Sequence, residues 1–267
     1  MHTSLWRLLE HGPADGSWNM AVDEAMVQGV GEGRVPPTLR FYTWKRPTVS
    51  LGLLQRIPGG VDLTACERLA IPLVRRPTGG RAVLHAQELT YSVVAPLAGP
   101  WRALSVPETF GLVSRALILG LERLGITALV GDSGMEAADR DRTGACFLGR
   151  RMPAVLVDGR KLIGSAQRRF RCAMLQHGSI LLDFDPALHK LVFPCWPRQE
   201  PSGGITHLHA LLGTPPSSHA LMQALAAGWQ QALGAACLPA ELTRDEAEAA
   251  ARLVRERYDA PAWTFQR

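Results

Sequence analysis

The chain has 267 residues, of which 46% are hydrophobic and 20% are charged, and its formal net charge is +5. This length and composition fit a globular protein with one large domain or two smaller ones. No segment reaches the roughly 18 uninterrupted apolar residues of a membrane span, and the first residues lack the regions of a secretory signal, so we expect a cytoplasmic protein that binds no membrane.

The first quarter of the chain predicts one long helix followed by short elements. Apolar residues at the spacing i, i+3, i+4, i+7 predict an amphipathic helix over residues 17–30. Alternating apolar residues predict strands near 39–41 and 49–53. A short helix over 63–69 then leads into a strand at 71–75.

A glycine pair with three arginines around it follows this strand. Apolar runs on both sides of Gly79 and Gly80 predict a tight hairpin, whose loop carries Arg75, Arg76 and Arg81. The glycines permit a positive φ and a close approach to backbone amides, and the arginines can neutralise an acidic group. Local sequence alone leaves a solvated turn open as the alternative.

The rest of the chain predicts more strands and three further helices. Strands are expected at 89–94, 126–130 and 179–182, with a hairpin at 155–157 and 161–166, and a long polar loop over 131–142. Capping residues predict helices over 105–124, 217–233 and 243–258. We therefore expect an α+β fold with a mixed, largely antiparallel sheet flanked by helices. Residues 1–185 would form the catalytic core, and 186–267 a smaller helical part packed on the same domain.

Five cysteines, scattered and without a C-x-x-C pair, predict free thiols and no metal site. Cys146 lies in the polar loop region with Arg150 and Arg151 close in sequence, and nearby cations lower a thiol pKa and favour the nucleophilic thiolate. A small buried thiol is the alternative for any cysteine. Lys161 begins a strand of small residues, where it could polarise a carbonyl or assist a thiol, or simply be exposed. His85 and His177 fit either a site or the core.

Other classes of function find little support. The clustered arginines would attract an acidic partner, but the chain has no zinc finger, no RRM-type aromatic signature and no long basic helix, so we expect no nucleic-acid partner. The common nucleotide-binding and hydrolase motifs are also missing. We expect no cofactor.

Several separated motifs, in order, resemble the lipoate-protein ligase A superfamily and, within it, the LipM-type octanoyltransferase branch. The motifs are Arg75–His85, Glu88–Val93, Gly144–Phe147 and Gly159–Gln167, extended by Asn19–Ala25, Leu39–Tyr42 and Gln176–Leu182. The resemblance covers most of residues 15–185 and implies a biotin/lipoate protein ligase-like catalytic domain.

The resemblance also implies a reaction and the residues for it. An octanoyl group would move from acyl carrier protein to a lysine of a lipoyl domain, such as the glycine-cleavage H protein. Cys146 would be the acyl-thioester nucleophile and Lys161 the lysine that lowers its pKa or polarises the carbonyl. The substrate-binding residues would be Arg75, Arg76, Thr78, Gly79, Gly80, Arg81, His85, Gly164, Ser165, Ala166, Gln167 and His177.

One departure and three alternatives accompany the resemblance. The family usually carries an acid after the histidine of the glycine loop, where this chain has Ala86. An ATP-dependent lipoate or octanoate ligase, an enzyme that moves acyl groups between lipoyl domains, and a non-catalytic module that binds acidic partners remain open. The ATP-dependent ligases generally lack the loop cysteine, so Cys146 favours the transferase.

Overall fold

The computed structural model describes residues 5–57, 60–131, 153–195 and 204–266 of the chain. Its main sheet has eight strands in the order β11-β1-β2-β6-β10-β9-β8-β7. The strands are β1 Leu5–Ala14, β2 Thr38–Trp44, β6 Glu88–Pro96, β7 Leu129–Gly131, β8 Ala154–Val157, β9 Arg160–Arg169, β10 Ala173–Leu181 and β11 Ala236–Pro239. Strand β1 is parallel to both of its neighbours, and every other neighbouring pair is antiparallel. The predicted mixed, largely antiparallel sheet is confirmed.

A second sheet of three strands has the order β4-β3-β5. It consists of β3 Thr48–Leu51, β4 Leu73–Arg75 and β5 Val83–His85, with β3 parallel to β4 and antiparallel to β5. The hairpin predicted around Gly79 and Gly80 is therefore wrong, because β4 and β5 lie on opposite sides of β3. Residues 76–82 cross two strand spacings, about 10 Å, which seven residues span easily.

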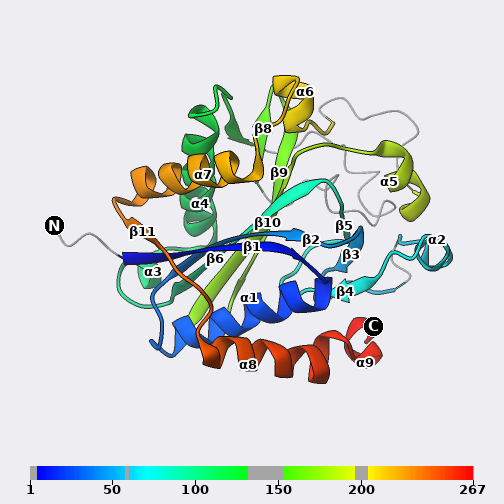
Figure 1. Cartoon of the computed structure of the whole chain (residues 1–267), viewed down its shortest axis with the longest axis horizontal. Coiled ribbons are helices and arrows are strands. Elements are labelled where there is room, and N and C mark those ends of the chain that lie inside the picture. Colours follow the sequence, from blue (N-terminus) through cyan, green and yellow to red (C-terminus); the bar gives the residue numbers. More distant parts are fainter. Residues whose placement is uncertain (1–4, 58–59, 132–152, 196–203, 267) are drawn as a thin grey trace.

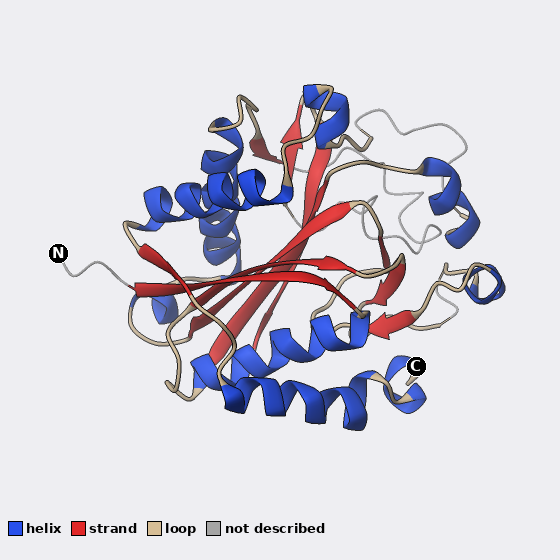
Figure 2. Cartoon of the chain, in the orientation of Figure 1, coloured by secondary structure: helices blue, strands red, loops and turns tan. Residues whose placement is uncertain are grey.

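Helices cover both faces of the main sheet (Figure 1, Figure 2). Helices α1 and α8 lie against one face, and α4 and α7 against the other. The helices are α1 Gly16–Gly31, α2 Leu63–Arg68, α3 Pro100–Ala103, α4 Val106–Glu122, α5 Pro186–Val192, α6 Leu208–Leu212, α7 Ser218–Leu233, α8 Arg244–Leu253 and α9 Pro261–Thr264, with a π-helical turn at Val254–Tyr258.

Local capping explains where several helices begin. Ser105 and Glu108 form the predicted capping box of α4, and Thr243 and Glu246 form that of α8. The Ser217 side chain caps α7.

Three apolar cores follow from this layering. One lies between the main sheet and α4 and α7, a second between the sheet and α1 and α8, and a third around the small sheet with α2 and α5. The boundary at residue 185 stays a prediction. The residues beyond it are interleaved with the rest, since β11 pairs with β1 at the edge of the main sheet and α8 packs on α1.

Candidate active site

A pocket of about 420 Å³, its open mouth included, lies where the main sheet, α1 and the small sheet meet. Among the predicted site residues, the structure brings six together in its lining: Arg76, His85, Gly164, Ser165, Ala166 and His177. The other lining residues are Met20, Tyr42, Trp44, Ser50, Val83, Thr90, Gly178 and Ser179. Apolar surface predominates, with polar groups at a few positions, which is the usual character of a small-molecule site.

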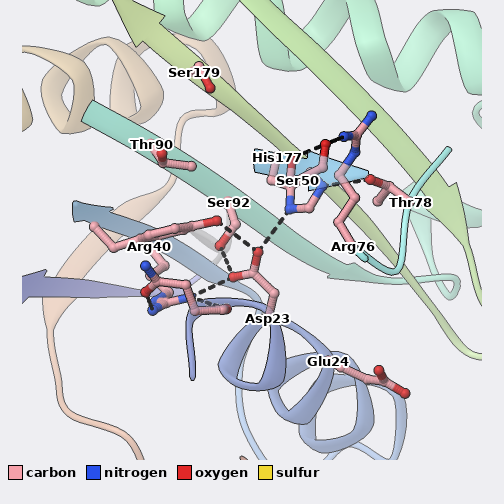
Figure 3. A network of polar contacts seen from close by, with 12 residues as sticks. Asp23, Glu24, Arg40, Ser50, Arg76, Thr78, Thr90, Ser92, His177 and Ser179 are labelled. Carbon is pink, nitrogen blue, oxygen red and sulfur yellow. Dashed lines mark hydrogen bonds and ion pairs between the residues drawn. The ribbon is translucent and has the colours of Figure 1, made fainter. Parts of the chain in front are cut away.

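His177 in the pocket lining belongs to a chain of hydrogen bonds, the Asp23 relay, which joins Asp23, His177 and Thr78 (Figure 3). His177 Nδ1 lies 2.9 Å from Asp23 Oδ2, and His177 Nε2 lies 2.6 Å from Thr78 Oγ1. Burial lowers the pKa of His177 despite the opposing effect of Asp23, so the ring is neutral near pH 7. Because a carboxylate only accepts, Nδ1 carries the proton and Nε2 accepts from the Thr78 hydroxyl.

A buried arginine balances the charge of this relay. Arg40 Nη1 lies 2.7 Å from Asp23 Oδ1, and both side chains are 0% exposed. The hydroxyls of Ser92 and Tyr42 also donate to Asp23, at 2.8 and 3.2 Å. Burial alone would raise the pKa of Asp23, but the hydrogen bond from His177 and the charge of Arg40 outweigh it and hold the pKa below its usual value.

A second chain, named here the Glu88 relay, joins Glu88, His85 and Ser50. His85 Nδ1 lies 2.7 Å from Glu88 Oε1, and His85 Nε2 lies 2.7 Å from Ser50 Oγ. Arg76 Nη1 donates to the same Ser50 oxygen at 3.0 Å. Since a guanidinium only donates, Ser50 Oγ accepts from Arg76, and the His85 ring joins this oxygen to the carboxylate of Glu88.

Glu88 accepts hydrogen bonds from two hydroxyls in addition to the one from His85. The hydroxyls of Thr90 and Ser179 donate to its Oε1 at 2.6 and 2.8 Å. Burial would raise the pKa of Glu88, but His85 and these two hydroxyls together lower it. Position 86, where the resemblance leads us to expect an acid, is an alanine. Glu88 nevertheless provides a carboxylate that contacts His85.

Both relays make contact with the glycine loop, residues 76–81. Thr78 ends the Asp23 relay, and Arg76 contacts the Glu88 relay while it donates to the carbonyls of Gly79 and Arg81, each at 2.7 Å. Gly80 has a φ of 92°, and a Cβ at Gly52 would lie 1.8 Å from the Gly80 carbonyl oxygen. The loop is therefore held closely against the end of β3.

Arg75 lies away from the pocket, and its proposed part in substrate binding stays a prediction. Its guanidinium donates to backbone carbonyls, those of Gly52 at 2.6 Å and Thr264 at 2.8 Å, and the side chain is fully buried. The Trp263 indole donates back to the Arg75 carbonyl at 2.9 Å. Arg75 thus joins the C-terminal helix α9 to the strand before the glycine loop and lies outside the pocket lining.

The remaining predicted residues divide between described and undescribed parts of the chain. Lys161 lies on β9, 4% exposed, with its backbone bonded to Gly204 and Thr206. It is outside the pocket lining but three residues before Gly164 on the same strand. Gln167 bonds to Thr109 and Gln176 instead of to the pocket. Cys146 lies outside the described residues.

The cysteines in the described part of the chain do not line the pocket. Burial raises the pKa of Cys66 and of Cys237 to about 11, which disfavours the thiolate at neutral pH. Cys172 and Cys195 are exposed and free. Within the described ranges, no group of three or more histidine, cysteine or acidic side chains could hold a metal ion, and no helix is long and apolar enough to cross a membrane.

The lipoyl protein ligase A/B catalytic domain family matches residues 15–230 of the chain. The chain belongs to this family. It is 42% identical to the octanoyltransferase LipM of Kyrpidia tusciae over 98% of this chain and 99% of the relative, and 31% identical to that of Bacillus subtilis over the full length of both. A bipartite lipoate protein ligase of Thermoplasma acidophilum has the same fold, with a TM-score of 0.80 and 23% identity over 99% of this chain and 97% of that one.

This member of the lipoyl protein ligase A/B family also contains site residues that the sequence analysis missed. The sequence does contain a signal for Asp23. Asn19 and Asp23 are polar residues at positions i and i+4, so they share one face of a helix whose other residues are mostly apolar or small. Glu88 sits three residues after His85. Ser50 and Ser179 carry no local signal, since short polar residues are common in strands that face a pocket.

Proposed function

We propose that the chain is an octanoyltransferase of lipoate biosynthesis, which takes octanoyl from acyl carrier protein and delivers it to a lysine of a lipoyl domain such as the glycine-cleavage H protein, in the cytoplasm. Full-length relatives that are 31–42% identical bear the name octanoyltransferase LipM. The similar archaeal ligase was analysed together with its E2 lipoyl domain, which supports a lipoyl-domain acceptor here.

The observation that carries the proposal is a mostly apolar pocket that is lined in part by the strand bearing Lys161. Gly164 and Ala166 of β9 line the pocket, and Lys161 precedes them on that strand. Gly131 precedes the stretch of sequence that contains Cys146 and Ala154 follows it, and these two residues pair with each other. Strand β8, which carries Ala154, is the direct neighbour of the strand of Lys161, and β7, which carries Gly131, is the next strand beyond it.

The proposed chemistry is two acyl transfers. The Cys146 thiolate attacks the octanoyl thioester carbonyl, a new C–S bond forms, and the bond to the carrier's thiol breaks. The amine of the acceptor lysine then attacks the enzyme thioester, the C–N bond forms, and the Cys146 thiolate leaves. Lys161 would stabilise the thiolate or the developing oxyanion with its positive charge. A thioester donor is already activated, so no ATP is required.

The test is intact-mass analysis of the protein mixed with octanoyl-acyl carrier protein and no ATP. We expect one octanoyl adduct that neutral hydroxylamine removes, that Cys146→Ala abolishes, and that the exposed-thiol variant Cys172→Ser retains. Addition of a lipoyl domain should move the octanoyl group to it. An adduct that survives Cys146→Ala, or one that forms only from octanoate and ATP, would contradict the proposal and favour an ATP-dependent ligase.

A further inference from the structure

The pocket floor is a row of residues that crosses four strands of the main sheet. Tyr42 pairs with Thr90, Thr90 with Ser179, and Ser179 with Gly164. Directly paired residues of antiparallel strands point to the same face, and all four line the pocket. The pocket therefore runs across the strands, from β2 to β9.

The two ends of this row differ in exposure. At the β2 end, Tyr42, Met20 and Trp44 are 0%, 2% and 7% exposed. At the β9 end, Gly164 and Ala166 are only partly buried, as is Val83 across from them. The pocket is thus closed at β2 and α1 and open at β9, so a chain-like ligand enters at β9 with its far end toward Met20.

The length of the row fits a medium acyl chain. Three strand spacings of about 4.8 Å separate β2 from β9, or about 14 Å between strand axes. Side chains at the closed end take up a few ångströms of this distance. With carbon–carbon bonds of about 1.5 Å, an extended eight-carbon chain measures about 9 Å. A chain of that length fits between the closed end and β9, and a longer one would meet the closed end.

Of the three side chains at the closed end, two are fixed by hydrogen bonds. The Tyr42 hydroxyl donates to Asp23 at 3.2 Å, and the Trp44 indole donates to Thr90 at 2.8 Å, while the Trp44 ring stacks on His85. Met20 packs there through apolar contacts of its unbranched side chain. Its length can therefore change without loss of a polar contact.

We infer that Met20 is the residue that sets the acyl-chain length, by contacting the terminal methyl of an octanoyl group. The inference rests on the octanoyl transfer proposed above and assigns the carboxyl end of the chain to β9, the strand that carries Lys161, and the methyl end to α1. Shortening Met20 would then extend the closed end of the pocket and admit longer chains.

The test compares octanoyl, decanoyl and dodecanoyl thioesters of acyl carrier protein as donors for the full-length enzyme. A hydrophobic pocket discriminates one methylene by about 10–200-fold in kcat/KM. We expect Met20→Ala to raise the decanoyl-to-octanoyl ratio of kcat/KM at least about tenfold. Met20→Val, a smaller truncation, should move the ratio in the same direction. It replaces the alanine variant in the test if that variant folds poorly.

Met26→Ala is the matched control. Met26 lies on the same helix, is fully buried in the same core as Met20, and does not line the pocket, so its truncation costs similar packing without lengthening the pocket. Its chain-length ratio should equal that of the wild type. Equal decanoyl-to-octanoyl ratios in the Met20 and Met26 variants would overturn the inference about Met20 and leave the proposed function intact. A wild-type protein that transfers no chain of any length would overturn the proposed function and this inference with it.

Discussion

The two relays that hold the glycine loop are built from the same groups but from different distances along the chain. Each runs from a buried carboxylate through a histidine to a hydroxyl. In the Asp23 relay the acid and histidine are 154 positions apart, whereas in the Glu88 relay they are three apart. The first depends on the packing of α1 against β10, and the second forms largely within one turn and one strand.

The relays also differ in how the negative charge is balanced. Asp23 faces the fully buried guanidinium of Arg40, while the bonds to Glu88 come from His85 and two hydroxyls. Removing the charge of Asp23 leaves the fully buried guanidinium of Arg40 without its partner. Removing that of Glu88 weakens the hydrogen bonds from His85 and the two hydroxyls. The comparison teaches that similar relays respond differently to mutation.

The largest expected effect is that of Asp23→Asn. Breaking a buried ion pair by removing one partner costs about 3–5 kcal/mol, because the other charge stays buried and uncompensated. Urea unfolding should show a loss of this size in the free energy of unfolding. Glu32→Gln removes an exposed partner of Arg34 and should change stability by less than about 1 kcal/mol. Equal losses in the two variants would contradict the role of the Arg40 pair.

Glu88→Gln should cost less, about 1–3 kcal/mol, since it places an amide among groups that donate to a carboxylate. Its Oε1 can still accept from Thr90 and Ser179. The same urea experiment provides the measurement, and a loss as large as that of Asp23→Asn would remove the distinction between the relays.

Acid pH should weaken the fold in two stages. The pKa of His177 is lowered by burial, as is that of His189, and burial with the charge of Arg40 lowers that of His11 to about 4. Such a histidine contributes stability that is present above its unfolded pKa, about 6.5, and is lost as pH falls through the folded pKa, by at most about 1.4 kcal/mol per pH unit for each proton.

The second stage comes from the acids. The pKa values of Asp23 and Glu88 are also lowered, so their contribution is present above about pH 4 and is lost below it. Unfolding measured from pH 8 to pH 3 should show a plateau, then a decline below about 6.5, and a steeper one below about 4. His177→Gln should reduce the slope of the first decline by up to the contribution of one proton, about 1.4 kcal/mol per pH unit. An unchanged slope would show that His177 does not contribute to this decline.

The smallest expected effect is that of Thr78→Val, about 1 kcal/mol, for the loss of one hydrogen bond at the end of the Asp23 relay. Thr78→Ser keeps the hydroxyl and should retain most of that free energy. Thermal unfolding of both variants supplies the comparison, and equal melting temperatures would show that the bond to His177 adds little to the stability of the loop.

The sequence by itself predicts the features that depend on neighbours along the chain. The capping boxes at Ser105 and Thr243 are confirmed, as is the hairpin predicted at 155–157 and 161–166, whose turn residues Asp158 and Gly159 have φ of 49° and 74°. These features arise from hydrogen bonds over a few residues and from backbone freedom at single positions. The motifs around the glycine loop likewise suffice for the family, because several short segments match in order.

Only the tertiary structure decides what those motifs contact. Strand β3 lies between the two strands that flank the glycine loop, and the carbonyls bound by Arg75 belong partly to residues 263 and 264. Asp23 meets His177 because α1 packs across the sheet. Such pairings depend on which surfaces bury each other and on which buried polar groups then need partners, and no local pattern of residues carries that information.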